Sequence, residues 1–184
     1  MTAWAGLNPR AAAADAVAAR WRLGAEAERE TARRLRALRL RGWRIRHDVR
    51  LTGRRFNLDH ILVSPCGTAV VMADTKRWPL GWTVTAAGGR LWCGGEDRTG
   101  EAEKAARYAS LVAGAVGVQV WPLLIVHGSR VAGGHVQVGT ESGPVQVVGV
   151  DQAVRVLRAA PAGWSWPRAR GVTVRVDEVL SPYR

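Results

Sequence analysis

Cysteine is scarce in this sequence, with only Cys66 and Cys93 among 184 residues. Because neither has metal-ligand spacing, the pattern excludes a disulfide-stapled scaffold and a cysteine-based zinc site. The four histidines also lack zinc spacing, and there is no glycine-rich phosphate loop ending in Lys-Ser or Lys-Thr to support NTP hydrolysis. We interpret both cysteines as reduced and expect a cytoplasmic protein.

A long hydrophobic run is also missing. Residues 108–128 contain no Asp, Glu, Lys or Arg, but Gly114, Gly117 and Pro122 divide them into the end of a helix and a buried strand. Residues 1–20 are rich in alanine and lack the compact apolar core of a signal peptide. We therefore expect no contact with a membrane, and a chain of this length can bury one ordinary domain core.

Lysine is almost absent, with two lysines against 25 arginines. Since arginine is the default cation of this chain, a lysine indicates a position that needs a compact ammonium group. Such an amine can approach a water or a phosphate closely. Lys76 closes the tripeptide Asp74-Thr75-Lys76 after an apolar run and is the candidate, whereas Lys104 lies in a charged helical stretch and is interpreted as a surface residue.

Acidic residues are sparse where arginine is densest. Between Arg33 and Arg55 there are ten arginines and one acid, Asp48, and the chain has a net charge of +12. Such a field favours a polyanion, because each neutralised phosphate adds salt-sensitive affinity. We expect nucleic acid as the partner, with DNA favoured over RNA. The alternative is that arginine is only this chain's default solvated residue.

Hydrophobic periodicity predicts an α/β fold. Residues 9–20 are expected to form a short helix that ends before Gly24, and residues 25–40 an amphipathic helix. Alternation predicts strands at 43–51 and 56–63, and a continuous apolar run predicts a central strand at 68–76. The rest is predicted as a hairpin (82–92), a helix (101–113), a strand near the sheet edge because it contains Pro122 (118–126), two short strands (135–138 and 145–150), a helix (151–159), a loop (161–167) and a final strand (172–176).

Asp59, Asp74 and Lys76 are predicted to meet. Period two places Asp59 on the inward face of its strand, and Asp74 and Lys76 on one face of the next strand. If residues 65–68 form a four-residue hairpin loop, antiparallel pairing puts Asp59 opposite Asp74. At ~4 Å and an effective dielectric of ~20, two carboxylates repel by ~4 kcal/mol, which a cation or a shared proton must relieve. Their oxygens, with the backbone carbonyl of Thr75, suit Mg²⁺ or Mn²⁺.

A metal at this position would acidify a bound water and polarise a phosphodiester, while Lys76 orients the water or stabilises charge on the phosphorus oxygens. These parts suit hydrolytic phosphodiester cleavage. The alternative is ordinary ion pairing at a strand end, with Asp74 bound to Lys76 or Arg77 and Asp59 capped by backbone donors. On the preceding helix Glu28 and Glu30 both flank the apolar face, and a helical projection does not choose between them.

Several short motifs follow one another in a characteristic order: Gly24-Ala25-Glu26-Ala27-Glu28, Gly42-Trp43, His47-Asp48-Val49, Asn57-Leu58-Asp59-His60, Val70-Val71-Met72-Ala73-Asp74-Thr75-Lys76, Leu91-Trp92 and Pro122-Leu123-Leu124-Ile125-Val126-His127-Gly128. Together they resemble the nuclease-related domain (NERD) family of the PD-(D/E)XK nuclease superfamily. The resemblance implies a restriction-endonuclease-like α/β core, with a central mixed β-sheet flanked by α-helices. It also implies that Asp59 and Asp74 are the acidic residues of the signature, Lys76 its lysine, and Glu28 the helix glutamate that completes the catalytic site.

By this resemblance residues 24–160 form the nuclease-like domain, preceded by a helical extension at 1–23 and followed by a C-terminal loop and strand at 161–184 that pack on the same domain. The implied activity is that of a Mg²⁺-dependent endonuclease acting on DNA. The alternative is a catalytically silent nucleic-acid-binding or regulatory module with the same fold. Flanking side chains are candidate substrate contacts, Trp78 by stacking on an unpaired base; they are Arg54, Arg55, Arg77 and Trp78.

Overall fold

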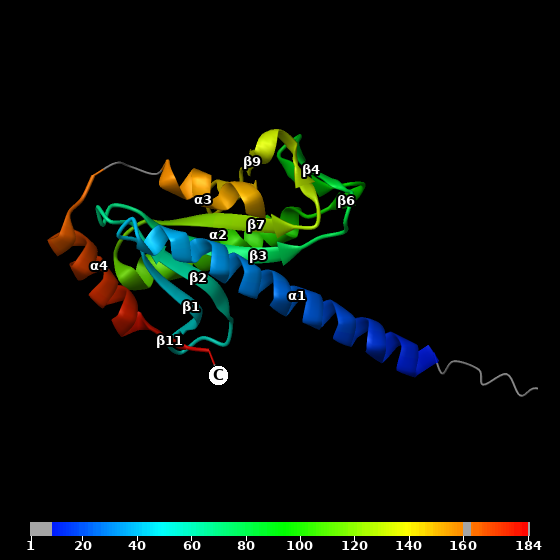
Figure 1. Ribbon diagram of the computed structural model, residues 1–184, viewed down its shortest axis with the longest axis horizontal. Coiled ribbons are helices and arrows are strands. Elements are labelled where there is room, and N and C mark those ends of the chain that lie inside the picture. Colours follow the sequence, from blue (N-terminus) through cyan, green and yellow to red (C-terminus); the bar gives the residue numbers. More distant parts are fainter. Residues whose placement is uncertain (1–8, 160–162, 184) are drawn as a thin grey trace, which may run out of the picture.

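A computed structural model describes residues 9–159 and 163–183 of the chain. Its main sheet has seven strands in the order β11-β1-β2-β3-β7-β10-β9 (Figure 1). These strands are β1 (Arg44–Leu51), β2 (Leu58–Val63), β3 (Val70–Arg77), β7 (Val120–His127), β9 (His135–Val138), β10 (Val145–Gly149) and β11 (Leu180–Pro182). The helices are α1 (Pro9–Arg39), α2 (Thr99–Val116), α3 (Val150–Arg158) and α4 (Trp166–Val179).

A second, smaller sheet has the strand order β6-β5-β4-β8 and contains the predicted hairpin. Its strands are β4 (Thr83–Ala87), β5 (Arg90–Cys93), β6 (Glu96–Asp97) and β8 (Arg130–Val131), and the 3₁₀ turn η1 (Ala132–Gly134) follows β8. In the main sheet β3 pairs antiparallel with β2 and parallel with β7. A mixed central sheet with helices on both faces confirms the predicted α/β class and is consistent with a restriction-endonuclease-like fold.

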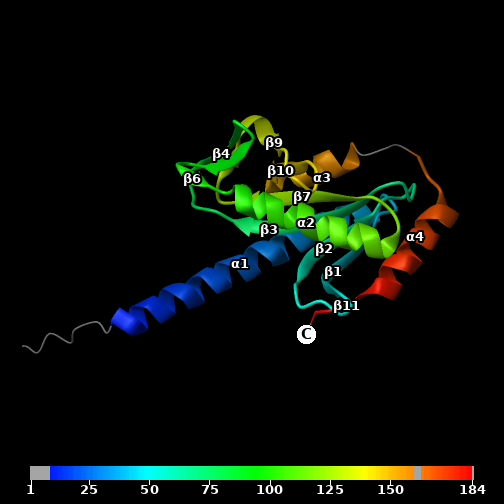
Figure 2. The ribbon, with the colours of Figure 1, turned by 180° about the vertical axis from the view of Figure 1, so that it is seen from behind.

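The two faces of the main sheet are covered by different helices. α1 and α3 cover the face seen in Figure 1, and α2 runs across the opposite face in Figure 2. Alternate residues of β3 serve the two sides, because side chains along a strand point in opposite directions in turn. Val70 and Met72 pack toward α2, whereas Val71 and Ala73 pack in the cluster that includes Leu35 of α1.

α1 is one continuous helix of 31 residues, so the predicted break at Gly24 is wrong. A glycine inside a helix costs about 1 kcal/mol relative to alanine, and the surrounding alanine, arginine and glutamate are good helix formers. The C-terminal half of α1 packs on the sheet, and its N-terminal half projects beyond the body (Figures 1 and 2). The predicted boundary between residues 23 and 24 therefore falls within one helix, and residues 1–8 lie outside the described part.

β7 lies in the middle of the sheet, between β3 and β10, so the predicted position near an edge is wrong. Pro122 is accommodated near the start of β7. It pairs with Met72 of β3, but the ladder with β10 begins only at Leu123. At Pro122 the strand therefore has a ladder partner on one side only, which is the situation a residue without an N–H tolerates.

The C-terminal segment is a helix rather than the predicted strand at 172–176. The alternation Val-Thr-Val-Arg-Val resembles a strand, but the side chains buried in α4 are spaced by three and four residues: Ala169, Val172, Thr173 and Val176. Tertiary burial along this stripe outweighs the local β propensity. The strand that follows is β11, which pairs with β1. Of the predicted loop at 161–167, residues 161 and 162 lie outside the described part and Trp166 and Pro167 belong to α4.

Among residues 9–159 and 163–183, no helix is both long and apolar enough to cross a membrane. Cys66 and Cys93 are both buried.

Candidate active site

Asp59 and Asp74 are brought together by the register of β2 and β3. His60 pairs with Ala73, and continuing this antiparallel register by one residue places Asp59 opposite Asp74, as predicted. Ser64 donates its N–H to the carbonyl of Ala69 at 2.9 Å, so the loop between the strands is residues 65–68. Counting alternate rungs from this hydrogen-bonded pair makes Asp59 and Asp74 a non-hydrogen-bonded pair, the kind whose side chains lie closer together.

The backbone of Thr75 closes the site beside Asp59. Its N–H donates to Oδ2 of Asp59 at 2.7 Å. In a strand the N–H and C=O of one residue point to the same side, so the Thr75 carbonyl is also directed toward β2. Because the paired part of β2 ends at His60, that carbonyl lies beyond the last rung of the β2–β3 ladder and beside Asp59.

The carboxyl of Asp59 is energetically unusual. Burial raises its pKa, and the negative charge of Asp74 raises it further, to about 8. The hydrogen bond from the Thr75 N–H lowers the pKa but does not offset these two effects. Asp59 therefore keeps a proton near neutral pH unless a cation replaces it.

Lys76 binds Asp74 through an ion pair of 2.6 Å between Nζ and Oδ2, and both side chains are largely shielded from solvent. Burial lowers the pKa of the Lys76 amine, but the charge and hydrogen bond of Asp74 raise it above its ordinary value. The amine is therefore a permanent cation. This contact, with the Thr75 donor to Asp59, is also what ordinary ion pairing at a strand end requires.

The choice between Glu28 and Glu30 follows from their partners. Glu30 accepts hydrogen bonds from Arg33 and from Arg34, the latter at 2.8 Å, and so is bound on the surface of α1. Glu28 faces the site instead: burial raises the pKa of its carboxyl, as do the charges of Asp48 and then Asp74, while Lys76 lowers it. Lys76 lowers the pKa of Glu28 and of Asp59 and forms an ion pair with Asp74. The three carboxylates therefore lie within electrostatic range of the same amine.

Asp48 is a further carboxylate of this region that sequence reasoning did not select. It lies in β1 between two rungs, His47 with His60 and Val49 with Leu58, so it faces Asp59 in the register. Its φ of 50° takes it out of the extended conformation, and among the described residues it is the only non-glycine with positive φ. An unusual backbone angle gives no signal in a single sequence.

Buried hydrogen bonds connect the elements that carry the site residues. Thr31 Oγ1 lies 2.8 Å from Nε2 of His127, which connects α1 to the end of β7 one helical turn after Glu28. On the same side of the sheet His60 contacts Thr75 Oγ1 at 3.3 Å and His47 at 2.9 Å. Burial, followed by His47, lowers the pKa of His60 to about 3, so this ring stays neutral. His47, His60 and His127 are packed residues of the fold.

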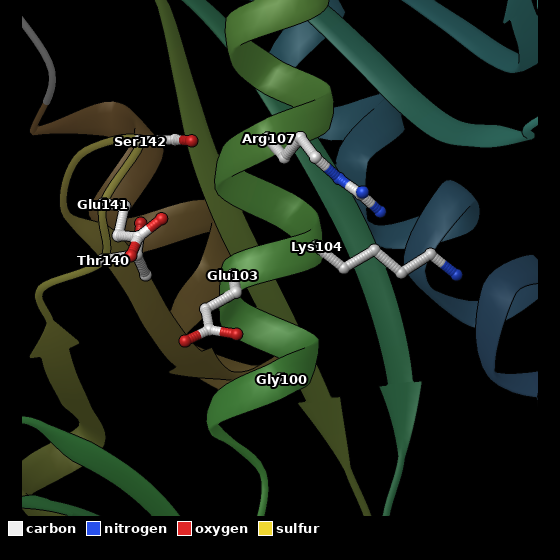
Figure 3. A pocket seen from close by; sticks show the side chains of 7 residues that line it. All are labelled: Gly100, Glu103, Lys104, Arg107, Thr140, Glu141 and Ser142. Atoms are coloured by element: carbon white, nitrogen blue, oxygen red, sulfur yellow. The ribbon is translucent and has the colours of Figure 1, made fainter.

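Lys104 lies nearer to the acidic pair than its place on a charged helix suggests. A small cavity beside Asp59 and Asp74 is lined on its α2 side by Lys104 and Tyr108, and the Lys104 amine lies 5.5 Å from the centre of the Tyr108 ring. Figure 3 shows Lys104 leaving α2 on the side away from Glu103 and the 140–142 loop. The signal that could have found it is the scarcity of lysine, which had pointed to Lys76.

A basic groove adjoins the site. This cavity of about 530 Å³ is lined by Arg20 of α1, by Lys76 and Arg77 of β3, and by Arg98 before α2. Trp78 also lines it but is only 4% exposed, with the Arg98 guanidinium 5.8 Å from the centre of its ring. That burial argues against the predicted stacking of a base on Trp78.

The other two predicted substrate contacts lie on a loop. Arg54 and Arg55 are exposed between β1 and β2, five and four residues before Asp59. Arg77 is exposed at the end of β3, where its guanidinium passes close to Gly128. Gly128 has a φ of +85°, and an added Cβ would lie 2.2 Å from the carbonyl oxygen of Trp78, so only glycine fits this turn.

The donor set suits a hard divalent cation. Two carboxylates and a directed backbone carbonyl are oxygen ligands, and Mg²⁺ commonly takes one or two carboxylates, keeping waters and phosphate oxygens as its other ligands. No group of three or more His, Cys, Asp or Glu side chains in the described residues is arranged to hold a metal ion. Two carboxylates and a carbonyl are the kind of ligands that Mg²⁺ or Mn²⁺ takes, whereas a structural zinc site takes cysteine or histidine.

A known family matches this chain. No curated protein and no solved structure gives a significant match to the chain. The family model described as "nuclease-related domain" matches residues 23–127, more than half of the chain, and this range includes Glu28, Asp59, Asp74 and Lys76. The chain therefore belongs to the nuclease-related domain (NERD) family.

Proposed function

We propose that this protein is a metal-dependent nuclease that hydrolyses phosphodiester bonds in DNA, with Glu28, Asp59, Asp74 and Lys76 as its catalytic residues. The observation that supports this most directly is that three carboxylates lie within electrostatic range of a single lysine. A site built only for stability would balance these charges, since buried carboxylates without partners are costly. A divalent cation would balance them here.

Asp59, Asp74 and the carbonyl of Thr75 would hold Mg²⁺ or Mn²⁺. When bound, this ion would polarise the phosphodiester and make a neighbouring water more acidic. Lys76, held by Asp74, presents a fixed positive charge to the oxygens of the phosphate, where negative charge develops during attack. Glu28 approaches from α1 with a raised pKa, which suits it to accept a proton from the attacking water.

The substrate backbone would follow the cations around this site. The basic groove supplies Arg20, Arg77 and Arg98 on one side of Lys76, and Lys104 lies on the other side, on α2. Arg54 and Arg55 extend this positive surface on the loop before β2. Contacts of this kind bind phosphate without reading sequence, so we expect affinity to fall steeply as salt concentration rises.

The test is a cleavage assay on linear, nicked, single-stranded and branched DNA, with Mg²⁺ or with EDTA. We expect Asp74→Asn and Lys76→Met each to reduce the rate by about 10²–10³-fold, because each removes a group that acts on the reacting phosphate. Glu103→Gln is the matched control and should cleave normally, since Glu103 leaves α2 on the side away from Lys104 (Figure 3).

Binding separates this function from its alternative. Both active-site variants should still bind DNA, because the arginines of the groove remain. Equal cleavage by the original chain and both variants would contradict the assigned residues. Salt-sensitive binding with no metal-dependent product would instead favour a nucleic-acid-binding module without turnover.

A further inference from the structure

One stripe of α1 continues past the end of the sheet. Side chains on this face recur every three or four residues, so they lie along one side of the helix. Leu35 and Leu38 are fully buried against the sheet, whereas Trp21 and Val17 are 76% and 43% exposed. The stripe runs, from body to tip, through Leu38, Leu35, Thr31, Glu28, Trp21 and Val17. Trp21 is thus on the same face as Glu28, two turns toward the tip.

A groove joins Trp21 to the candidate active site. This cavity of about 570 Å³ is lined by Trp21 and Glu28 on α1, and its opposite side is formed by Asn57 and Tyr183, which precede β2 and follow β11. Asn57 also lines the small cavity beside Asp59 and Asp74. The two cavities are therefore neighbours, connected through one side chain.

The chemistry of the groove fits a nucleobase. Trp21 and Tyr183 offer aromatic rings, both substantially exposed, and aromatic rings stack on bases of any sequence. The Oδ1 atom of Asn57 is buried with no hydrogen-bond partner, which is uncommon for a polar atom, and its amide suits the edge of a base. An apolar helix or a second copy of the chain fits less well, because Glu28 and Asp48 also line the groove.

Arg20 offers a phosphate contact beside Trp21. Arg20 lines this groove and also the basic groove on the other side of α1, where Lys76 and Arg77 lie. A strand whose phosphates follow the basic groove would pass Arg20 beside Trp21. A paired base is held inside the duplex, whereas an unpaired base is free to stack on a protein ring.

We propose that Trp21 stacks on an unpaired base of the substrate, so that the site acts where a single-stranded segment adjoins the bond to be cut. This inference rests on the proposed nuclease function for its location, but the stacking itself needs no metal. It predicts that Trp21 contributes to the binding of single-stranded DNA and does not contribute to the binding of blunt duplex DNA.

The test measures binding of the full chain in EDTA, by fluorescence anisotropy, to a labelled 20-nucleotide single strand and to a blunt duplex of the same sequence. Trp21→Ala should weaken binding of the single strand about 5- to 100-fold, the range of one stacked base, and change duplex binding less than twofold. Trp21→Phe should retain most of the affinity. Trp164→Ala is the control, because Trp164 is 71% exposed and lies at the other end of β2, against Gly42 and Pro65.

An unchanged affinity of Trp21→Ala for the single strand would overturn the proposal, as would an equal loss on both DNA forms. These outcomes are distinct from failure of the nuclease assignment. A chain that shows the selective loss but cleaves nothing would support the stacking and contradict the catalysis. A chain that cleaves DNA but binds single strands equally well with and without Trp21 would do the reverse.

Discussion

The same face of α1 is buried in the C-terminal half of the helix and exposed in the N-terminal half. In the C-terminal half the face is buried and anchored, by Leu35 in the core and by Thr31 on His127. In the N-terminal half it projects beyond the body (Figure 1), and Trp21 on this face is exposed. Hydrophobic burial requires a surface to pack against, and among the described side chains of α1 the first buried one from the N-terminal end is Ala27. We infer that the packed half supplies stability and positions Glu28, whereas the projecting half is available to a ligand.

The largest expected effect is a difference in the free energy of unfolding between substitutions in the two halves of α1. Leu35→Ala should lower the free energy of unfolding by about 2–5 kcal/mol, because it opens a cavity in a fully buried cluster. Val17→Ala on the projecting half should change it by less than about 0.5 kcal/mol. Urea denaturation followed by circular dichroism measures both. A loss for Val17→Ala approaching that of Leu35→Ala would mean that the projecting half is packed in solution.

The same contrast explains which parts of the fold can be predicted from sequence. Periodicity is a local property, and it predicted β2, β3 and the packed half of α1 because each buries one face against the body. It failed at Gly24, since nothing local indicates that the helix continues without support. It failed again in α4, where Val172 and Val176 satisfy both a strand alternation and a helical spacing, and only packing on the body decides between them.

Some residues of the candidate site can likewise be predicted from local sequence patterns, and others cannot. The meeting of Asp59 and Asp74 needs only period two and a four-residue turn, both of which are local. Glu28 comes from a distant element, and a helical projection left it equivalent to Glu30 until the partners of each were known. Asp48 and Lys104 reach the site through pairing of β1 and packing of α2, which no spacing in the sequence encodes.

The next prediction concerns the anchor of the packed half. Thr31→Val removes the hydroxyl that bonds His127 and leaves a buried ring nitrogen without its partner, so we expect a loss of about 1–3 kcal/mol. Cleavage should also fall under conditions where the variant stays folded, because Glu28 is one turn away. Thr31→Ser keeps the hydroxyl and should restore both properties. If Thr31→Val cleaves DNA as fast as Thr31→Ser, the anchor does not position Glu28.

The smallest expected effect locates the boundary between the halves. An added Cβ at Gly24 meets no atom within 4 Å, and neither does one at Gly114 in α2, so alanine fits both positions. Replacing an interior helical glycine by alanine stabilises by about 0.5–1 kcal/mol when the residue unfolds together with the body. Gly114→Ala should show this full gain in urea denaturation, because α2 is packed against the sheet along its length.

Gly24→Ala should show less than half of that gain, together with a rise in helical circular dichroism. The reason is that a projecting helix frays independently, so added helix propensity there stabilises the helix without stabilising the body. Equal gains at the two positions would place Gly24 inside the cooperative unit and move the boundary toward Trp21. In that case Trp21 would stand on a rigid support, and the stacked base would be held at a fixed distance from Glu28.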